Sequence, residues 1–132
     1  MGVFSKIFTW WNGSTVGTSW TLMRRGRKVG QDEFGNTYFE ARDAKDSYDG
    51  RKRRYVTYTG YAEPSKIPPE WHAWMHYITD VPPSEQPLAR QPWEADHQPN
   101  FTGSGRAYRP KGAIVHDTGA QKQQDHYQAW VP

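Results

Sequence analysis

The sequence contains no cysteine among its 132 residues. Disulfide bridges, thiolate metal sites and cysteine nucleophiles are therefore excluded. The sequence also lacks the order of a Ser-His-Asp triad, a phosphate-binding Gly-Lys loop and a dinucleotide-binding fingerprint. No carboxylate stands out as a candidate acid or base, because none is set among apolar residues. The sequence thus predicts no active site, and we expect a protein that is not an enzyme.

Aliphatic side chains are scarce. Leu, Ile, Val and Phe together make up 18 of the 132 residues, which is below the roughly 20% that separates ordinary globular chains from disordered ones. The net charge is only +3, however, and the chain has seven Trp, eight Tyr and five Phe. Aromatic rings supply large buried areas that disordered chains usually lack. We therefore predict a small head with an aromatic core, followed by segments that become ordered against a partner.

The N-terminus has no long apolar run. The apolar residues at this end are too few to span a bilayer, and their aromatic content is too high for a signal peptide. We expect the chain to start in its mature form in a bacterial cytoplasm.

A helical stripe runs through residues 3–11, where apolar residues recur at i, i+3, i+4, i+7 and i+8: Val3, Phe4, Ile7, Phe8 and Trp11. We predict a docking helix within residues 1–12. It is shorter than the roughly 12 to 15 residues that an isolated helix needs, so it must pack on its own domain, in a partner groove or on a membrane. A single Lys makes an electrostatic membrane anchor unfavourable, and we expect contact with protein.

Residues 13–83 carry the pattern of a small sheet and one covering helix. Strand-forming residues occur at Val29, at 37–39 and at 54–59, where side chains alternate. The turn 32–36 between the first two strands contains Gly35 and Asn36, which tolerate the positive φ of a tight hairpin. Three strands are the minimum for an independently stable sheet, so we predict an α+β fold with a three-stranded antiparallel sheet.

The covering helix is predicted within the string PPEWHAWMHYITDVPP, residues 68–83, because its prolines suit the first turn and the end of a helix. Four apolar residues of this string fall on one helical face. The predicted core consists of Tyr38, Phe39, Val56, Tyr58, Trp71, Trp74, Met75 and Ile78.

Two histidines on the other face of this helix, His72 and His76, have the spacing of a metal-binding pair. Metalloprotease helices need a Glu after the first His and a third ligand, whereas Ala73 follows His72. We therefore expect surface or interface histidines and no metal site.

Two basic runs, RRGRK at 24–28 and RKRR at 51–54, flank two neighbouring predicted strands. Basic and aromatic residues together are typical of a nucleic-acid-binding module. Residues 1–79 hold 12 basic and 8 acidic side chains, a modest excess for binding through phosphate contacts. A solvated face, or one that docks on an acidic protein, is the favoured interpretation.

Residues 84–132 show no helix or strand period and are rich in proline, while aromatic residues recur along them. A structureless segment of this length on a compact domain is unusual unless it is a linker or wraps a partner. We predict an extended, partner-wrapping arm.

Several strings together resemble one family: VGQDEFGNTYFE, RRYVTYTG, IPPEWHAWMHY and PNFTGSGRAYRP. They are similar to the small accessory subunit of respiratory complex I, the proton-pumping NADH:ubiquinone oxidoreductase, in its alphaproteobacterial form. The same family includes an assembly factor for that complex. The resemblance implies a short N-terminal helix, a small antiparallel sheet, one covering helix and a long extended arm.

The resemblance also implies a function. We expect a non-catalytic subunit of the peripheral arm, near the quinone-reducing module and the cytoplasmic face of the bacterial inner membrane. Its partners would be core and other accessory subunits, with no transmembrane span and no nucleic acid. Flavin, iron-sulfur clusters and quinone would belong to other subunits, and a chain without cysteine has no thiolates for such clusters. A transient assembly factor is the alternative. The expected partner-contacting residues are Phe4, Phe8, Trp11, Arg53, Arg54, Trp93, His97, Asn100, Phe101, Tyr108 and Trp130.

Overall fold

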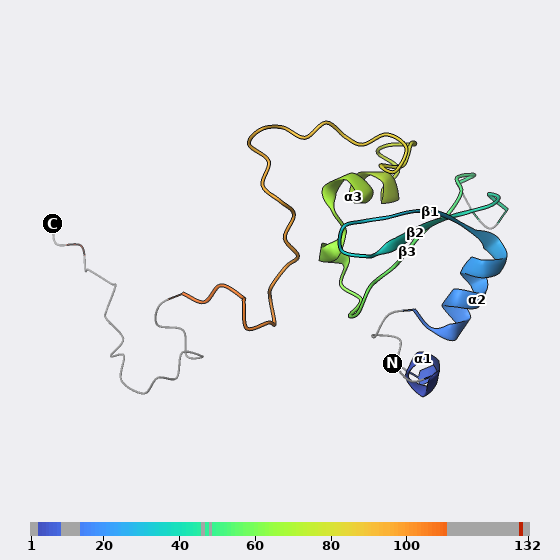
Figure 1. The fold of residues 1–132 in the computed structure, drawn as a ribbon, viewed down its shortest axis with the longest axis horizontal. Coiled ribbons are helices and arrows are strands. Elements are labelled where there is room, and N and C mark those ends of the chain that lie inside the picture. The colour runs from blue at the N-terminus through green and yellow to red at the C-terminus, as the bar shows by residue number, and fades with distance from the viewer. Residues whose placement is uncertain (1–2, 9–13, 46, 48, 111–129, 131–132) are drawn as a thin grey trace. The chain divides into compact units, whose positions relative to one another are not determined.

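The structure is a computed structural model that describes residues 3–8, 14–45, 47, 49–110 and 130. The chain divides into two compact units, residues 1–99 and residues 100–132. The first unit contains α1, α2, β1, β2, β3, the short 3₁₀ helix η1 and α3 (Figure 1). The predicted α+β class, with its three-stranded sheet and covering helix, is confirmed. One helix, α2, was not predicted.

Helix α1 spans Val3–Phe8 and α2 spans Val16–Arg25. The side chain of Thr15 caps α2, because its Oγ1 accepts a hydrogen bond from the N–H of Thr18 at 3.2 Å. Leu22 is the residue of α2 that is buried. The helix ends at Gly26, where a Cβ would lie 2.7 Å from the Leu22 carbonyl oxygen, so the close turn into the sheet requires glycine.

The sheet is an antiparallel meander in the order β1-β2-β3, formed by Gly26–Gln31, Thr37–Ala41 and Arg54–Thr57. The pairing of β1 with β2 shifts between Lys28 and Gly30, so Val29 forms a bulge. The bulge leaves the Val29 carbonyl free to accept a hydrogen bond from the Ser84 hydroxyl at 3.1 Å. Residue 84, which begins the predicted arm, is thereby attached to the first strand.

The loop between β1 and β2, residues 32–36, is organised by side chains. The Asp32 carboxylate accepts hydrogen bonds from the N–H groups of Phe34 and Asn36, both at 2.9 Å. Gly35 adopts a φ of 83°, whereas Asn36 has no positive φ, so that part of the turn prediction was wrong. Asn36 is instead fully buried, and its Oδ1 accepts the N–H of Thr59 at 3.1 Å.

Helix α3, Pro69–Met75, follows η1, Pro64–Lys66, and covers one face of the sheet (Figure 1). Trp71 stacks on Tyr38 of β2, with ring centroids 4.0 Å apart and planes only 4° apart. Trp74 lies edge-on to both rings, 6.4 Å from Tyr38 and 5.7 Å from Trp71. These three aromatic residues form the buried cluster, and partly buried residues pack around it: Val29, Val56, Ile67 and Met75.

Three residues of the predicted core lie outside this cluster, and the prediction was wrong for them. Ile78 is 73% exposed. Helix α3 ends at Met75, and Tyr77 has a φ of 58°, so Ile78 leaves the helical stripe on which it was counted. Phe39 is half-buried because adjacent strand residues point to opposite faces, which sends it away from Tyr38. Tyr58 follows the end of β3 and is also half-buried.

The described residues 84–110 contain neither helix nor strand. Residues 84–99 nevertheless group with the head. The His97 ring nitrogen Nε2 lies 2.7 Å from the Ser65 carbonyl oxygen, and the ring meets the edge of Phe34 at 5.8 Å. The head thus continues beyond residue 83, where it was predicted to end.

The described start of the second unit is a compact turn. The Phe101 carbonyl accepts hydrogen bonds from the N–H of Ser104 at 2.9 Å and from its hydroxyl at 2.6 Å. Gly103 has a φ of 82°, and the Arg106 guanidinium lies 4.2 Å from the Phe101 ring centroid. This turn holds its shape through contacts within residues 100–107.

We predict that Gly30→Ala destabilises the head by about 1 to 3 kcal/mol, a typical cost of overpacking. A Cβ at Gly30 would lie 2.6 Å from Cη2 of Trp71, the ring on which the core depends. The measurement is urea denaturation followed by tryptophan fluorescence. Gly17→Ala is the matched control, because a Cβ there meets no atom closer than 3.9 Å, and alanine inside a helix is neutral or stabilising. Equal stability of the two variants would contradict the packing described.

Candidate interaction surfaces

Arg54 is held inside the head. Its side chain is only 6% exposed, and its guanidinium Cζ lies 4.5 Å from the ring centroid of Trp74 and 4.4 Å from that of Tyr77. It donates hydrogen bonds to the carbonyl oxygens of Trp74, Thr79 (3.0 Å) and Asp80 (3.4 Å). Arg54 therefore caps the end of α3 from strand β3, where unpaired carbonyls need a donor.

The expectation that Arg54 contacts a partner was therefore wrong. Its charge is balanced internally, because Nε lies 3.8 Å from Oε1 of Glu40. Arg53, by contrast, has an exposed side chain and remains available at the surface. The planar guanidinium of Arg54 suits the capping role because it stacks on aromatic rings and donates hydrogen bonds in several directions at once.

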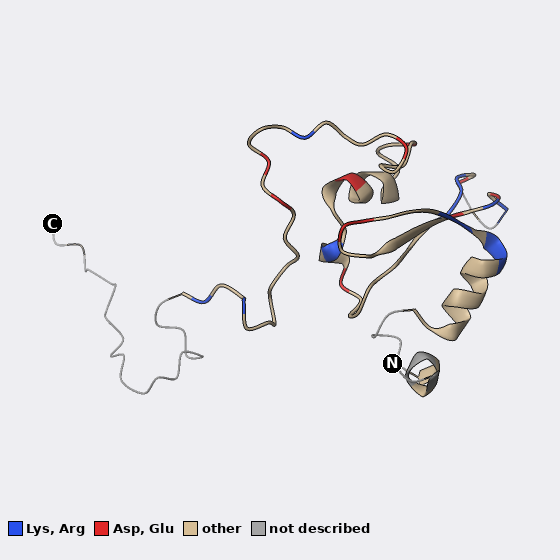
Figure 2. Ribbon diagram, in the orientation of Figure 1, with Lys and Arg blue, Asp and Glu red and all other residues tan. Residues whose placement is uncertain are grey.

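The two basic runs do not lie on neighbouring strands, because β2 separates β1 from β3. Both runs nevertheless lie where β1 and β3 begin, and these two strands run in the same direction. Figure 2 shows Lys and Arg gathered at this end of the sheet, around the junction of α2 with β1. Arg54 is withdrawn from that surface, which weakens the case for a nucleic-acid-binding face.

Tyr38 links the core to the 32–36 loop. Its hydroxyl donates to Oδ2 of Asp32 at 2.7 Å, and the Asn36 side-chain amide donates to the same oxygen at 2.9 Å. Burial raises the pKa of Tyr38 well above its ordinary value of 10.0, and the hydrogen bond to the Asp32 carboxylate raises it further. The folded head therefore keeps this phenol protonated.

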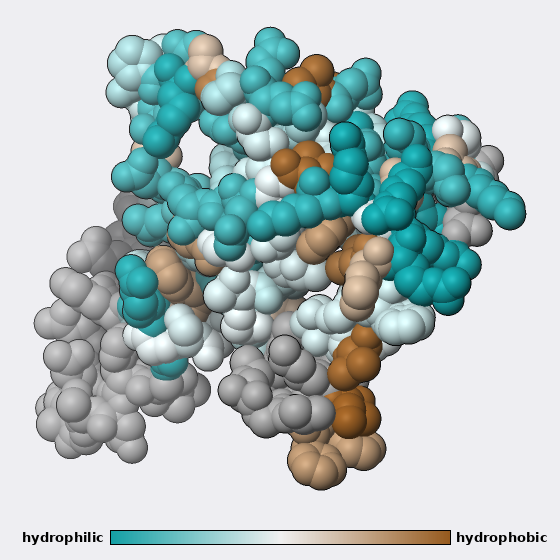
Figure 3. All heavy atoms as spheres, turned by 45° about the vertical axis from the view of Figure 1, so that its right-hand side comes forward, coloured by the Kyte–Doolittle hydropathy of each residue, from teal (hydrophilic) through white to brown (hydrophobic). Residues whose placement is uncertain are grey.

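An apolar surface runs along α2. Val16, Trp20 and Met23 recur at i, i+4 and i+7 and are 50%, 59% and 68% exposed, which places them on one face of the helix. Figure 3 shows brown, hydrophobic side chains gathered over α1 and α2. We call the three residues of α2 the α2 stripe. Sequence reasoning missed it because Gly17, Thr18 and Ser19 are poor helix formers, although Thr15 as an N-cap could have signalled the helix.

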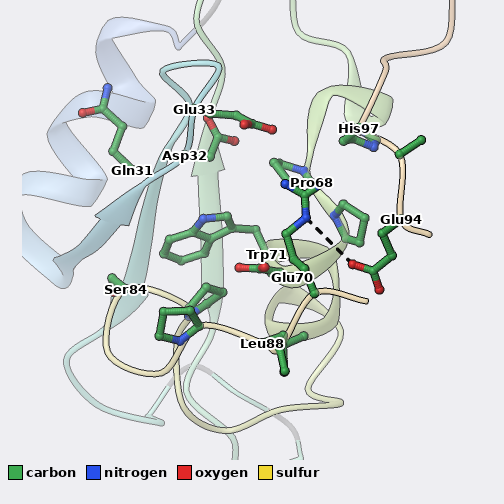
Figure 4. A pocket seen from close by; sticks show the side chains of 16 residues that line it. Gln31, Asp32, Glu33, Pro68, Glu70, Trp71, Ser84, Leu88, Glu94 and His97 are labelled. Atoms are coloured by element: carbon green, nitrogen blue, oxygen red, sulfur yellow. Dashed lines mark ion pairs between the residues drawn. The ribbon is translucent and has the colours of Figure 1, made fainter. Parts of the chain in front are cut away.

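A groove of about 720 Å³ lies beside Trp71, between the hairpin turn, the start of α3 and the segment 83–97. Figure 4 shows Trp71 at its centre and the carboxylates of Glu33 and Glu94 on its rim. Arg90 reaches Glu94 at 3.8 Å and Asp96 at 3.0 Å. Residues 83–97 form one wall of the groove, so the groove exists only while these residues stay attached to the head.

The residues predicted to contact partners separate into two groups. Phe4, Phe8, Trp93, Tyr108 and Trp130 are exposed; the last three are 80%, 91% and 83% exposed. His97, Asn100 and Phe101 are engaged within their own units instead: the Asn100 Oδ1 accepts the Thr102 N–H at 3.0 Å. Trp11 lies outside the described residues.

The His72 and His76 rings lie 4.2 Å apart, centroid to centroid, on the exposed side of α3. The described residues contain no group of three or more His, Cys, Asp or Glu side chains placed to hold a metal ion. In the part of the chain that the structure describes, no helix combines the length and the apolar character needed to cross a bilayer.

A small aromatic-cored head with large rings left on its surface is typical of a subunit that is completed by neighbours in a larger assembly. The family model described as NADH ubiquinone oxidoreductase subunit NDUFA12 matches residues 26–132. The chain therefore belongs to this family of complex I accessory subunits, as the sequence strings predicted.

Individual relatives agree. A Caenorhabditis elegans protein named probable NADH dehydrogenase (ubiquinone) 1 alpha subcomplex subunit 12 is 33% identical over 113 residues, covering 83% of this chain and 69% of the relative. The Bos taurus protein named subunit 12 of the same subcomplex is 34% identical over 120 residues, covering 83% and 74%. An uncharacterised protein of Rickettsia prowazekii is 42% identical over 71 residues, covering 54% and 68%.

We predict that Arg54→Lys costs about 2 to 4 kcal/mol of unfolding free energy, because an ammonium group lacks the planar fork and leaves buried acceptors unpaired. Arg53→Lys, at the exposed neighbouring position, is the control and should change stability by less than about 0.5 kcal/mol. Chemical denaturation of both full-length variants provides the comparison. A neutral Arg54→Lys would show that the cap carries little stability.

The raised pKa of Tyr38 predicts alkaline destabilisation. Because the folded-state pKa lies above the unfolded value of 10.0, the stabilising effect is complete below that pH. It is lost as the pH rises further, by at most about 1.4 kcal/mol per pH unit for one proton. Tyr38→Phe should cost about 1 to 2 kcal/mol at neutral pH and flatten the loss above about pH 10.

The measurement for Tyr38 is the urea midpoint as a function of pH. Tyr61→Phe serves as the control because Tyr61 is exposed, and it should follow the native chain throughout. A Tyr38→Phe curve parallel to the native one would contradict the role assigned to this phenol.

Proposed function

We propose that this chain is a non-catalytic accessory subunit of the peripheral arm of proton-pumping NADH:ubiquinone oxidoreductase and stabilises the assembled enzyme near its quinone-reducing module. Membership of the accessory-subunit family supports the subunit role. The stabilising role is supported by one observation: the large rings of Trp93, Tyr108 and Trp130 are exposed, and they lie on backbone that is neither helix nor strand.

Rings in such positions contribute little to the free chain. When a partner pocket buries such a ring, the ring typically contributes about 2 kcal/mol or more to the binding free energy. The surrounding prolines restrict the unbound backbone, and this restriction lowers the entropy that is lost on ordering. Segments of this composition bind by wrapping a neighbour.

The partners are then core and accessory subunits of the complex, and the site of action is the cytoplasmic face of the bacterial inner membrane. The names of the Caenorhabditis elegans and Bos taurus relatives support a place among the subunits of NADH dehydrogenase. Flavin, iron-sulfur clusters and quinone chemistry belong to other subunits in this proposal, and the chain supplies binding surfaces.

We predict that Trp93→Ser combined with Tyr108→Ser lowers co-purification of the tagged full-length chain with complex I by at least about tenfold, as expected when two anchor residues are lost. Tyr61→Ser is the matched control, an exposed ring on the head, and should leave co-purification unchanged. Circular dichroism verifies that both variants are folded. Equal recovery of complex I with both variants would contradict wrapping by these rings.

A truncated chain ending at Pro99 separates the head from the second unit. It retains the Ser84 and His97 contacts, so we expect native head stability and loss of the chain from complex I. Blue-native electrophoresis of active enzyme with the full-length chain gives the second readout. A chain present in assembly intermediates but absent from the finished enzyme would identify an assembly factor instead of a subunit.

A further inference from the structure

The side chains of the α2 stripe are not covered by the sheet. Leu22 is the buried residue of α2, while Val16, Trp20 and Met23 are at least half exposed on another face. In α1, Phe4, Ile7 and Phe8 are exposed as well. Both helices therefore leave large apolar side chains exposed.

Within the segment 1–31, all charged side chains have one sign. Residues 1–31 contain five basic residues and no Asp or Glu. Arg24 and Arg25 end α2, and Arg27 and Lys28 follow in β1. Arg27 pairs with Glu40 at 3.5 Å, and the Arg24 guanidinium lies 5.8 Å from the Trp20 ring centroid. Figure 2 shows the cations at the end of α2, beside the apolar surface seen in Figure 3.

We propose that α1 and the α2 stripe form a surface anchor that binds the headgroup region of a bilayer containing anionic phospholipid. Apolar and aromatic side chains on one face, with cations at the edge, are typical of helices that lie in the membrane interface. The six residues of α1 and ten of α2 are too few to cross a bilayer. The helices therefore lie on the membrane surface.

Charge complementarity selects lipid over a protein groove as the occupant. The single Lys of residues 3–11 attracts an anionic membrane only weakly by itself, but α2 and the start of β1 add four more cations. Each Lys or Arg near an anionic surface strengthens binding by about fivefold. An anionic bilayer surface supplies opposite charge beside the apolar side chains, whereas a protein groove does so only if it is itself acidic.

The anchor is independent of the family match, which begins at Gly26, immediately after α2. The inference therefore goes beyond the proposed function, because it concerns lipid and not other subunits. A chain that fails to bind vesicles leaves the subunit role unaffected, and a chain that is absent from complex I leaves the anchor unaffected.

The experiment is flotation of the purified full-length chain with vesicles of phosphatidylcholine alone or with about one quarter phosphatidylglycerol. We expect binding to the anionic vesicles that weakens as salt rises, and little binding to the neutral ones. Trp20→Ser combined with Met23→Ser should weaken anionic binding by roughly tenfold or more through loss of apolar burial. Arg24→Gln combined with Lys28→Gln should weaken it by roughly twentyfold.

Matched controls lie on other surfaces of the chain. Trp93→Ser removes an exposed ring outside α1 and α2, and Arg106→Gln with Arg109→Gln removes two exposed cations outside residues 1–31; both should bind vesicles more tightly than the α2 variants. Because all the altered residues are exposed, native circular dichroism is expected for every variant.

Three results would overturn the anchor: no flotation of the native chain with anionic vesicles, equal flotation with neutral ones, or α2 variants indistinguishable from native. Loss of co-purification with complex I by the Trp20 and Met23 variant, together with unchanged vesicle binding, would assign the stripe to a protein partner instead.

Discussion

The stack of Trp71 on Tyr38 is the contact on which the head depends. It joins the covering helix to the central strand at a centroid distance of 4.0 Å, and side chains from β1, β3 and the segment before α3 pack against the cluster it belongs to. Gly30 lacks a side chain because the ring of Trp71 occupies that space. Tyr38 in turn carries the hydrogen bond to Asp32 that organises the hairpin turn. A chain poor in aliphatic residues thus builds its core from flat rings, whose packing tolerates little displacement.

Buried polar side chains also join parts of the head to one another. Arg54 caps α3 while it stacks on Trp74 and Tyr77, and Asn36 joins the hairpin to the segment after β3. Both are buried polar side chains whose partners come from distant parts of the sequence. Such groups are costly unless they are paired, so each one fixes a single arrangement of its neighbours.

Local pattern was sufficient to predict the sheet, the hairpin and the two tryptophans of α3, because each depends on a short period of two or of three to four residues. It failed where tertiary contacts decide. Ile78 was counted on a helical stripe that Tyr77 interrupts with a positive φ, and Arg54 was taken for a surface cation although β3 places it against the end of α3. Helix α2 was missed because its Gly, Thr and Ser residues mask the spacing of Val16, Trp20 and Met23. The family itself was evident from four short strings.

The attachment of residues 84–99 to the head through Ser84 and His97 has a consequence in the cell. A head with only three large aromatic residues in its buried cluster has little stability in reserve. Any neighbour that holds this segment in place also lowers the population of opened heads by mass action. A copy whose segment is not held in this way opens more often, and the opened form is the one that proteases cleave.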